Sequence, residues 1–258
     1  MLDEVVKIAE AAGRIAAARF GGDFRRWEKA AGERGAGSPV CEIDLEVDRF
    51  LRRELAAIDP QAGWLSEETV DLSDRIERRR LWVVDPIDGT RDYVRERTGW
   101  CVSIALVEDR VPVLGVLAAP LRGEVWTGSR GQGSWRNGVR LHVSPRATLA
   151  GARVPADQLP AVDRDLVAVA RPNSIALRIA MVAAGEADLV ATLRWGYEWD
   201  IAAAALIAEE AGATVTGALG QPLAFNTASG EAFGVLVATP GIHAAAVDRL
   251  RDRAMAVV

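Results

Sequence analysis

The chain has 258 residues, of which 50% are hydrophobic and 26% are charged, and its net charge at pH 7 is −5. This length suffices for one large domain or for two half-domains that share an interface. The acidic balance argues against a protein that binds a nucleic-acid polymer, which would need a basic face. Two cysteines, Cys41 and Cys101, provide neither a disulfide framework nor a cysteine-based zinc site.

The N-terminal residues predict two amphipathic helices. Apolar residues at helical spacing indicate a helix from Leu2 to Phe20, and the charges scattered through it are not typical of a signal peptide. No uncharged run approaches the length of a membrane span, so we expect a cytoplasmic protein without membrane partners. Residues 29–38 are polar and glycine-rich and predict a loop. A second helix is expected from Pro39 to Ile58, with Asp44 near its start, where an acid also suits the helix dipole.

The stretch from Leu81 to Thr90 carries the clearest chemical signal. Four apolar residues, which predict a buried strand, run directly into the sequence D-P-I-D-G-T. Asp85 and Asp88 are close in sequence, and two adjacent carboxylates repel each other unless a cation or a shared proton relieves them. The stretch contains no lysine, so a divalent metal is the simplest relief. Gly89 and Thr90 then offer backbone N–H groups at an expected helix start, which suits an anion such as phosphate.

The remaining pattern predicts an α/β (α+β) chain that divides near residue 150. In residues 1–150 the expected strands are Gly63 to Ser66, Cys101 to Val107, Val111 to Ala118, Glu124 to Thr127 and Trp135 to Val143, with a hairpin turn at Asn137-Gly138. In residues 151–258 the expected strands are Leu166 to Ala170, Ala187 to Leu193, Ala213 to Thr216, Leu223 to Phe225 and Gly234 to Ala238. Helices are expected at Ser174 to Gly185, with Ser174 as the cap, at Ile201 to Ala211 and from Gly241 onward. We therefore predict an N-terminal α+β half with an antiparallel sheet and most metal ligands, and a C-terminal α/β half.

Acidic residues follow strand-like runs or open helices at three places: Glu67-Glu68, Asp85 with Asp88, and Asp200. Each has a structural alternative, because a glutamate pair is commonly a solvated loop and aspartates commonly cap helices. The two histidines of the chain lie far from these clusters in sequence, and no H-E-x-x-H pattern occurs. Oxygen ligands alone favour Mg²⁺ or Mn²⁺ over zinc.

The spacing of the motif separates this chain from other hydrolases. The haloacid dehalogenase phosphatases use D-x-D-G-T after an apolar strand, whereas D-P-I-D-G-T has one residue more between its acids. The EF-hand pattern, the G-x-S-x-G elbow and the Walker A pattern do not fit either. The carboxylates are therefore interpreted as metal ligands and not as nucleophiles.

Four segments resemble, in order, the motifs of the inositol monophosphatase superfamily of Mg²⁺-dependent, lithium-sensitive phosphatases, which includes the CysQ-type 3′(2′),5′-bisphosphate nucleotidases. They are the S-P-V…D…V-D pattern of Ser38 to Asp48, S-E-E-T at Ser66 to Thr69, D-P-I-D-G-T at Asp85 to Thr90, and W-D-x-A-A…E-A-G at Trp199 to Gly212. These matches span most of the chain. The resemblance implies a five-layer αβαβα sandwich.

The resemblance also implies a metal site with two or three Mg²⁺ ions, with Mn²⁺ as a substitute and Li⁺ as an inhibitor. The implied ligands are Glu67, Asp85, the Ile87 carbonyl, Asp88 and Asp200.

The implied reaction is hydrolysis of a small phosphate monoester by a metal-activated water that attacks in line. Thr90, with Asp44 or Glu67, would accept the proton of this water. The implied substrate-binding residues are Asp88, Gly89, Thr90, Arg194 and Asp200.

Three residues upstream depart from the family pattern. Arg34 stands where lysine is frequent, Ala36 where aspartate is common and Cys41 where threonine is usual. These differences concern the third metal and the loop over it, and not the core site. For Cys41 a redox switch is one reading, but we expect a packed thiol.

The substrate is predicted from the residues before Asp200. Inositol monophosphatases usually carry an acid there that holds inositol hydroxyls, whereas this chain has Arg194, Trp195 and Tyr197. An arginine can meet a second phosphate and an aromatic ring can stack on a base, although both rings could simply pack the strand end. Glu198-Trp199-Asp200 also resembles the E-W-D of the CysQ-type nucleotidases.

We therefore expect a 3′(2′),5′-bisphosphate nucleotidase that converts 3′-phosphoadenosine 5′-phosphate to AMP. Inositol monophosphatase or histidinol-phosphatase activity is the alternative, and a metal- or phosphate-binding regulator is the non-enzymatic one. The expected partner is a small phosphorylated metabolite, and a homodimer stays open.

Overall fold

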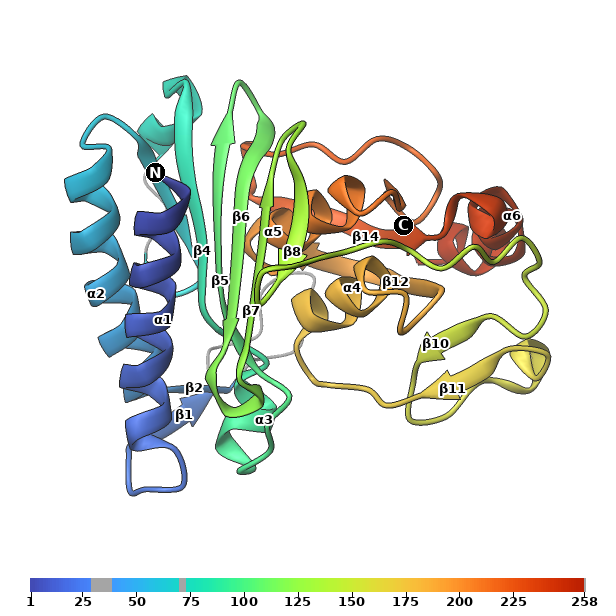
Figure 1. The fold of residues 1–258 in the computed structure, drawn as a ribbon, viewed down its shortest axis with the longest axis horizontal. Helices are drawn as coiled ribbons and strands as arrows, with labels where there is room; N and C mark the ends of the chain where they lie inside the picture. The colour runs from blue at the N-terminus through green and yellow to red at the C-terminus, as the bar shows by residue number, and fades with distance from the viewer. Residues whose placement is uncertain (29–38, 70–72, 258) are drawn as a thin grey trace.

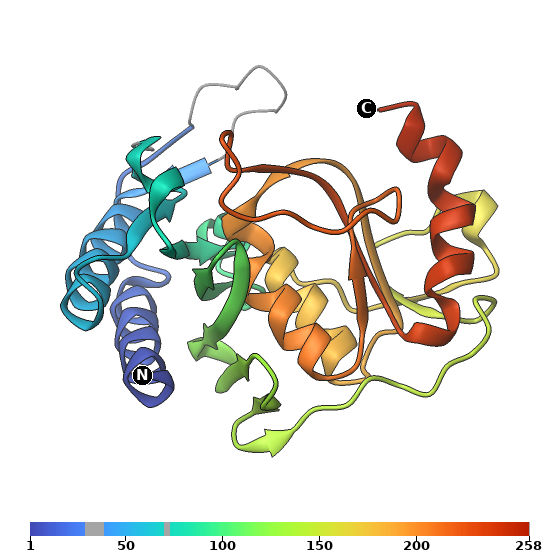
Figure 2. The ribbon, with the colours of Figure 1, turned by 90° about the horizontal axis from the view of Figure 1, so that it is seen from above.

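The computed structural model describes residues 1–28, 39–69 and 73–257. Five layers lie side by side (Figures 1 and 2), which confirms the predicted αβαβα sandwich. The helices α1 (Leu2–Arg19) and α2 (Glu42–Ile58) cover one face of a seven-stranded sheet, and α4 (Ile175–Ala183) and α5 (Glu198–Glu210) cover the other. A smaller sheet and α6 (Pro240–Met255) complete the stack. Within the described ranges, no helix is both long and apolar enough to span a membrane.

The predicted loop at 29–38, with Arg34, Ala36 and Ser38, lies outside the described residues. The helix predicted from Pro39 starts later, at Glu42. Pro39–Cys41 instead forms strand β2, which pairs antiparallel with β1 (Arg26–Glu28). The helix begins where the side chain of Asp44 accepts a hydrogen bond from the backbone N–H of Cys41 at 2.7 Å. The thiol of Cys41 is buried in the core, as expected for a packed cysteine.

The large sheet has the strand order β3-β4-β5-β6-β7-β8-β9. Its strands are β3 (Gly63–Ser66), β4 (Arg80–Asp88), β5 (Cys101–Glu108), β6 (Val111–Ala119), β7 (Glu124–Ser129), β8 (Gly133–Arg136) and β9 (Val139–Arg140). Only β3 and β4 are parallel among these pairs, so the predicted antiparallel meander is confirmed. The strand predicted to reach Val143 ends at Arg140. The chain leaves the sheet there, and Val143 N donates to Ala211 O at the end of α5.

The smaller sheet has the order β12-β14-β13, and both of its strand pairs are antiparallel. Its strands are β12 (Leu189–Tyr197), β13 (Thr214–Thr216) and β14 (Glu231–Ala238), and a separate parallel pair is formed by β10 (Arg153–Pro155) and β11 (Val167–Val169). The strand predicted at Leu223 to Phe225 is wrong, because this segment is irregular. Phe225 nevertheless packs into the core, which explains the apolar signal.

Strand β4 is buried on both faces, and this explains its uninterrupted apolar run. Trp82 and Val84 pack toward α1 and α2, whereas Leu81 and Val83 pack toward α4 and α5. The alanine-rich α5 lies close against the same sheet. A Cβ atom on Gly115 of β6 would come within 2.7 Å of the carbonyl oxygen of Ala203, so glycine is required there. The close approach of α5 brings its first turn to the end of β4.

Candidate active site

Both aspartates of D-P-I-D-G-T lie within β4, which contains a bulge. Asp85 is paired with Ser103 and Asp88 with Cys101, so three steps along β4 match two along β5. Residues three apart point to opposite faces of a regular strand, and the extra residue of the bulge brings both carboxylates to the same side. The apolar run was expected to lead into the acids at the end of the strand, and β4 carries both acids and ends at Asp88.

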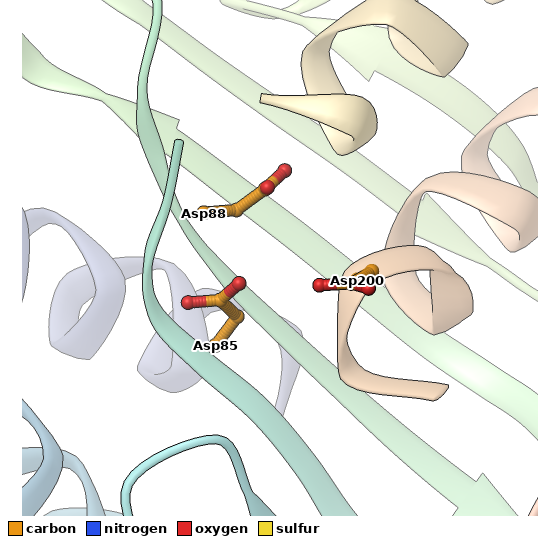
Figure 3. Close-up of side chains that lie close together, drawn as sticks. All are labelled: Asp85, Asp88 and Asp200. Carbon is orange, nitrogen blue, oxygen red and sulfur yellow. The ribbon is translucent and has the colours of Figure 1, made fainter. Parts of the chain in front are cut away.

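Asp200, in the first turn of α5, completes a cluster of three carboxylates. One oxygen of each of Asp85, Asp88 and Asp200 lies within 4.8 Å of the others, and the three side chains lie close together (Figure 3). Asp85 and Asp88 are buried, with exposures of 1% and 5%. Asp200 is partly buried, and three like charges at such a site are unfavourable without a counter-ion. Hard oxygen donors at this spacing fit a divalent cation such as Mg²⁺, although their roles as ligands remain a prediction.

The surroundings of the cluster disfavour its charged form. Burial raises the pKa of Asp85 well above its usual range, and the charges of Glu67, Asp88 and Asp200 raise it further. Burial, followed by the charges of Asp88 and Glu67, raises the pKa of Asp200 to about 8. The cluster therefore holds protons at pH values where isolated aspartates are ionised, unless a cation replaces those protons.

This proton uptake predicts how the stability of the metal-free protein depends on pH. Between the ordinary pKa of 3.8 and about 8, folded Asp200 holds a proton that the unfolded chain has released. The free energy of unfolding should therefore fall as pH rises through this window. Chemical denaturation with chelator present at pH 6 and pH 8 measures the change. Asp200→Asn should flatten the slope, and an equal slope in wild type and variant would contradict the shift.

Asp88 is fixed by the N-terminus of α4. Its carboxylate accepts hydrogen bonds from Ser174 Oγ, from Ala176 N at 2.8 Å and from Ile175 N at 3.3 Å. Ser174 also caps α4, as predicted, because its Oγ accepts from Leu177 N at 2.9 Å. Burial is the largest influence on the pKa of Asp88, but these donors offset part of it, so the pKa rises only to about 6. The sequence signal identified the cap but not its contact with Asp88.

Thr90 and Asp44 lie beside the cluster. Thr90 Oγ1 is 2.9 Å from the carbonyl oxygen of Ile87 and 3.3 Å from Asp44 Oδ1, and both side chains are buried. The Ile87 N–H donates to Asp85 Oδ1 at 3.0 Å, so the bulge also orients that carboxylate. Asp44 also lies in the first turn of α2, as the structural alternative for this residue predicts.

Gly89 forms the start of the predicted short helix α3 (Thr90–Val94). It is the N-terminal cap and has a φ of 96°, in the left-handed region. A Cβ atom there would lie 2.8 Å from Gly99 O, so only glycine fits. Asp88 is therefore not the cap of α3, and Tyr197 rather than Asp200 caps α5. Asp200 instead accepts from the Tyr197 N–H at 3.1 Å.

Glu67 follows β3 directly, and its N–H donates to Val84 O at 3.4 Å. The turn that presents it is anchored on Asp48, which accepts hydrogen bonds from Ser66 Oγ and, at 2.7 Å, from Thr69 Oγ1. Glu67 is partly buried, and its charge contributes to the raised pKa values of Asp85 and Asp200. Glu67 thus lies near the cluster of three carboxylates but is not part of it. Because it is partly buried, it does not fit the alternative of a solvated acidic loop.

A buried network that the sequence analysis missed holds the start of α5. The carboxylate of Glu198 accepts from Asn226 N at 2.6 Å, Thr227 N at 2.8 Å and Thr227 Oγ1 at 2.6 Å. Arg75 in turn donates to Asn226 Oδ1 at 2.7 Å and to Thr227 O at 3.0 Å. Arg75 also packs against Gly63 in β3, the strand that precedes Glu67. Glu198 was associated with substrate choice, but its carboxylate is fully buried and structural.

We expect Glu198→Gln to weaken divalent metal binding by about tenfold, the scale of changes in groups that orient metal ligands. The amide cannot accept from both Asn226 N and Thr227 N, so the start of α5 and Asp200 with it should loosen. Calorimetric titration with Mn²⁺ measures the affinity. Glu186→Gln, a surface acid paired with Arg136, is the control and should bind like wild type. An unchanged affinity of Glu198→Gln for Mn²⁺ would contradict the inference that Glu198 positions Asp200.

Arg194 and Asp200 line the same pocket. The lining of this pocket, which is open to solvent, includes Ile175, Thr192, Arg194, Tyr197 and Asp200. Tyr197 is 40% exposed and stacks on Trp199, with ring centroids 4.3 Å apart and an angle of 8° between the planes. Trp195 packs against Phe233 at 5.5 Å, which matches the alternative that this ring only packs the strand end. Of the described residues that line the pocket, Asp200 alone is acidic.

Comparison with known proteins identifies the family. A sequence model described as the inositol monophosphatase family matches residues 1–256. The chain belongs to the inositol monophosphatase family. Members of this family are metal-dependent phosphatases, so the chain is a phosphoric monoester hydrolase, and the cluster of Asp85, Asp88 and Asp200 can hold the metal.

Relatives of this family member have names that indicate different functions. It is 29% identical to the 3′(2′),5′-bisphosphate nucleotidase CysQ of Aggregatibacter actinomycetemcomitans, over 88% of this chain and 87% of that protein. It is 36% identical to the Nus factor SuhB of Xylella fastidiosa, over 68% of each chain. The solved structure of the Thermotoga maritima IMPase superposes with a TM-score of 0.83 at 27% identity, covering 100% of this chain and 99% of that one. The family is therefore clear, whereas the substrate requires a further argument.

Proposed function

We propose that this phosphatase is a Mg²⁺-dependent 3′(2′),5′-bisphosphate nucleotidase that hydrolyses 3′-phosphoadenosine 5′-phosphate to AMP. The observation that carries the proposal is the joint position of Arg194 and the Tyr197 ring at the pocket beside Asp200. A guanidinium is suited to a second phosphate, and a half-exposed aromatic ring is suited to stack on a base. The likeness to a CysQ nucleotidase supports the same substrate class.

The protein groups around the cluster have distinct roles in this proposal. Glu67, Asp85, the Ile87 carbonyl, Asp88 and Asp200 would hold Mg²⁺, which when bound neutralises phosphate charge and lowers the pKa of water. The N–H groups of Gly89 and Thr90 would orient the phosphate that is cleaved. The same proposal includes two or three Mg²⁺ ions per site, replacement of Mg²⁺ by Mn²⁺ and inhibition of the enzyme by Li⁺.

Proton acceptance is assigned to Thr90 and Asp44. A water that donates to Thr90 Oγ1 would let the threonine hydroxyl donate to Asp44 Oδ1, which lies 3.3 Å away in a buried position. Glu67, whose charge acts on Asp85 and Asp200, is the alternative acceptor to Asp44. Both acceptors are carboxylates of the protein that can take up the proton of the water. The water itself is then the nucleophile, and no side chain attacks the phosphate.

A phosphate-release panel tests the substrate. The substrates are 3′-phosphoadenosine 5′-phosphate, inositol 1-phosphate, fructose 1,6-bisphosphate and histidinol phosphate, each measured with Mg²⁺, with Mn²⁺ and with added Li⁺. We expect the highest kcat/KM on the adenosine bisphosphate. A preference for inositol 1-phosphate or histidinol phosphate would overturn the substrate and keep the phosphatase. No release from any of them would favour a metal- or phosphate-binding regulator.

Arg194→Ala should raise KM for the adenosine bisphosphate by about tenfold and change KM for inositol 1-phosphate little. The reason is the loss of a charge-assisted hydrogen bond to the second phosphate, reduced by the exposure of this side chain. Initial-rate kinetics on both substrates measure the effect. Arg251→Ala on the surface of α6 is the control. An equal change in KM for both substrates would contradict recognition of a second phosphate.

A further inference from the structure

A second and larger cavity lies on the opposite face of β12 from the active site. Thr192 and Arg194 line the pocket at Asp200, whereas Leu189, Ala191 and Leu193 line the larger cavity. The alternation of side chains along a strand separates the two spaces. The cavity has a volume of about 510 Å³, within the range of about 300 to 1,000 Å³ that is typical of sites for small organic ligands. Its other walls are formed by the segment 154–166 and by α6.

The floor of this cavity is apolar. Leu149, Leu189 and Leu250 belong to the hydrophobic cluster between the smaller sheet and α6, and Leu166 and Leu193 pack against it while only partly buried. These leucines line the cavity, which is open to solvent, so part of this hydrophobic cluster is not covered by protein. Covering apolar surface of this kind with the apolar part of a ligand is favourable, because it removes the surface from water.

Four arginines also line the cavity, and three of them are paired with aspartates. Arg249 contacts Asp165 at 2.8 Å, Arg253 contacts Asp163 at 2.8 Å, and Arg171 contacts Asp157 at 2.5 Å. The fourth, Arg178 on α4, donates only to the carbonyl oxygens of Asn173 at 2.6 Å and Ser174 at 3.2 Å, and it makes no ion pair with a described residue.

Arg178 thus has positive charge and hydrogen-bond donors in excess. A guanidinium carries five N–H donors, and the two carbonyls use two of them. Burial, followed by the positive charge of Arg171, lowers the pKa of Arg178 to about 10, and the charges of Asp88 and Asp157 offset only part of this effect. An anionic group in the cavity would supply both the missing charge and the missing acceptors.

We propose that this cavity is a second ligand site, which binds an organic anion. The carboxylate, sulfonate or phosphate group of the ligand pairs with Arg178, and its apolar body covers the leucine floor. This site lies on the opposite face of β12 from the pocket at Asp200, although the charge of Arg178 acts on Asp88. The proposal does not depend on the substrate proposed for the phosphatase centre.

Fluorescence titration of the full-length chain with 8-anilinonaphthalene-1-sulfonate tests the site, because this probe joins a sulfonate to apolar rings. We expect saturable binding of one equivalent. Arg178→Met should weaken it by at least about tenfold, through loss of a charge-assisted contact. Ala191→Phe, which fills the cavity next to the leucine floor, should abolish it. Arg251→Met is the matched control, since this α6 arginine does not line the cavity and should bind the probe like wild type.

Several results would overturn the site. One is unchanged probe affinity in Ala191→Phe. Another is an affinity that Arg194→Ala lowers as much as Arg178→Met, which would place the probe in the pocket at Asp200. A third is self-association in sedimentation that Ala191→Phe disrupts, since a second copy would then cover the cavity. If Arg178→Met fails to fold by circular dichroism, Ala191→Phe decides the question alone.

Discussion

Replacing Asp88 by asparagine is expected to lower kcat/KM for phosphate release by about 10²- to 10³-fold, the scale of losing one preorganised electrostatic group. The change removes a charge from the cluster with Asp85 and Asp200, where a divalent cation would be held. It also creates a conflict, because an amide N–H₂ cannot accept the hydrogen bond that Ala176 N or Ile175 N donates to the carboxylate. Steady-state assays at saturating Mg²⁺ measure the loss.

Asp92→Asn is the matched control for this change. Asp92 is also buried and also accepts a backbone hydrogen bond, from Asn173 N at 3.0 Å, but it is not part of the cluster. We expect it to reduce stability and to leave kcat/KM within a few-fold of wild type. Near-full turnover of Asp88→Asn, or equal losses in both variants, would contradict a metal-holding role for Asp88.

Removal of divalent metal is expected to reduce phosphate release to background, and added Mg²⁺ should restore it. The same metal should stabilise the fold, because it binds the folded cluster and relieves the repulsion among Asp85, Asp88 and Asp200. At a metal concentration 100 times Kd this stabilisation is about 2.7 kcal/mol. Thermal unfolding with EDTA and with Mg²⁺ measures the shift in Tm.

Asp88→Asn and Asp200→Asn should each lose most of this shift in Tm, whereas Asp92→Asn should keep it. The comparison separates binding at the cluster from weak binding of Mg²⁺ to the acidic surface of a chain with net charge −5. Full turnover in the presence of EDTA would contradict the metal-dependent mechanism. An equal shift in all three variants would place the stabilising metal elsewhere.

Much of this architecture could be predicted from local patterns. The apolar run before Asp85 predicts a strand buried on both faces, and β4 is such a strand. Ser174 predicts a helix cap, and it caps α4. The hairpin signal at Asn137-Gly138 predicts the turn between β8 and β9, where both residues adopt positive φ. For the helix cap and the hairpin turn, the deciding interactions lie within a few residues of the pattern.

The geometry of the site depends on contacts between distant segments, which local patterns do not encode. Asp88 meets the N-terminus of α4, 86 to 88 residues later in the chain, and Arg75 meets Asn226, 151 residues later. The bulge in β4 depends on its pairing with β5, so a single-strand pattern does not predict it. The irregular segment at Leu223 to Phe225 reads as a strand because Phe225 is buried, although no strand pairs with it in the described sheets.

The division of the chain near residue 150 stays a prediction, and so do the individual roles of the site residues. What the structure adds is that segments from β4 and α5, more than 100 residues apart in sequence, bring three carboxylates to one point. The chemistry of the family depends on a cation at such a point, and its location is therefore the centre of the account.

Anomalous diffraction from crystals grown with Mn²⁺ tests that location most directly. We predict an anomalous peak within about 2.0 to 2.6 Å of one oxygen from each of Asp85, Asp88 and Asp200, at the ligand distances of hard divalent cations. The peak should disappear in crystals of Asp88→Asn. An active enzyme whose crystals show no peak at these three carboxylates, or show the metal only elsewhere, would contradict the account.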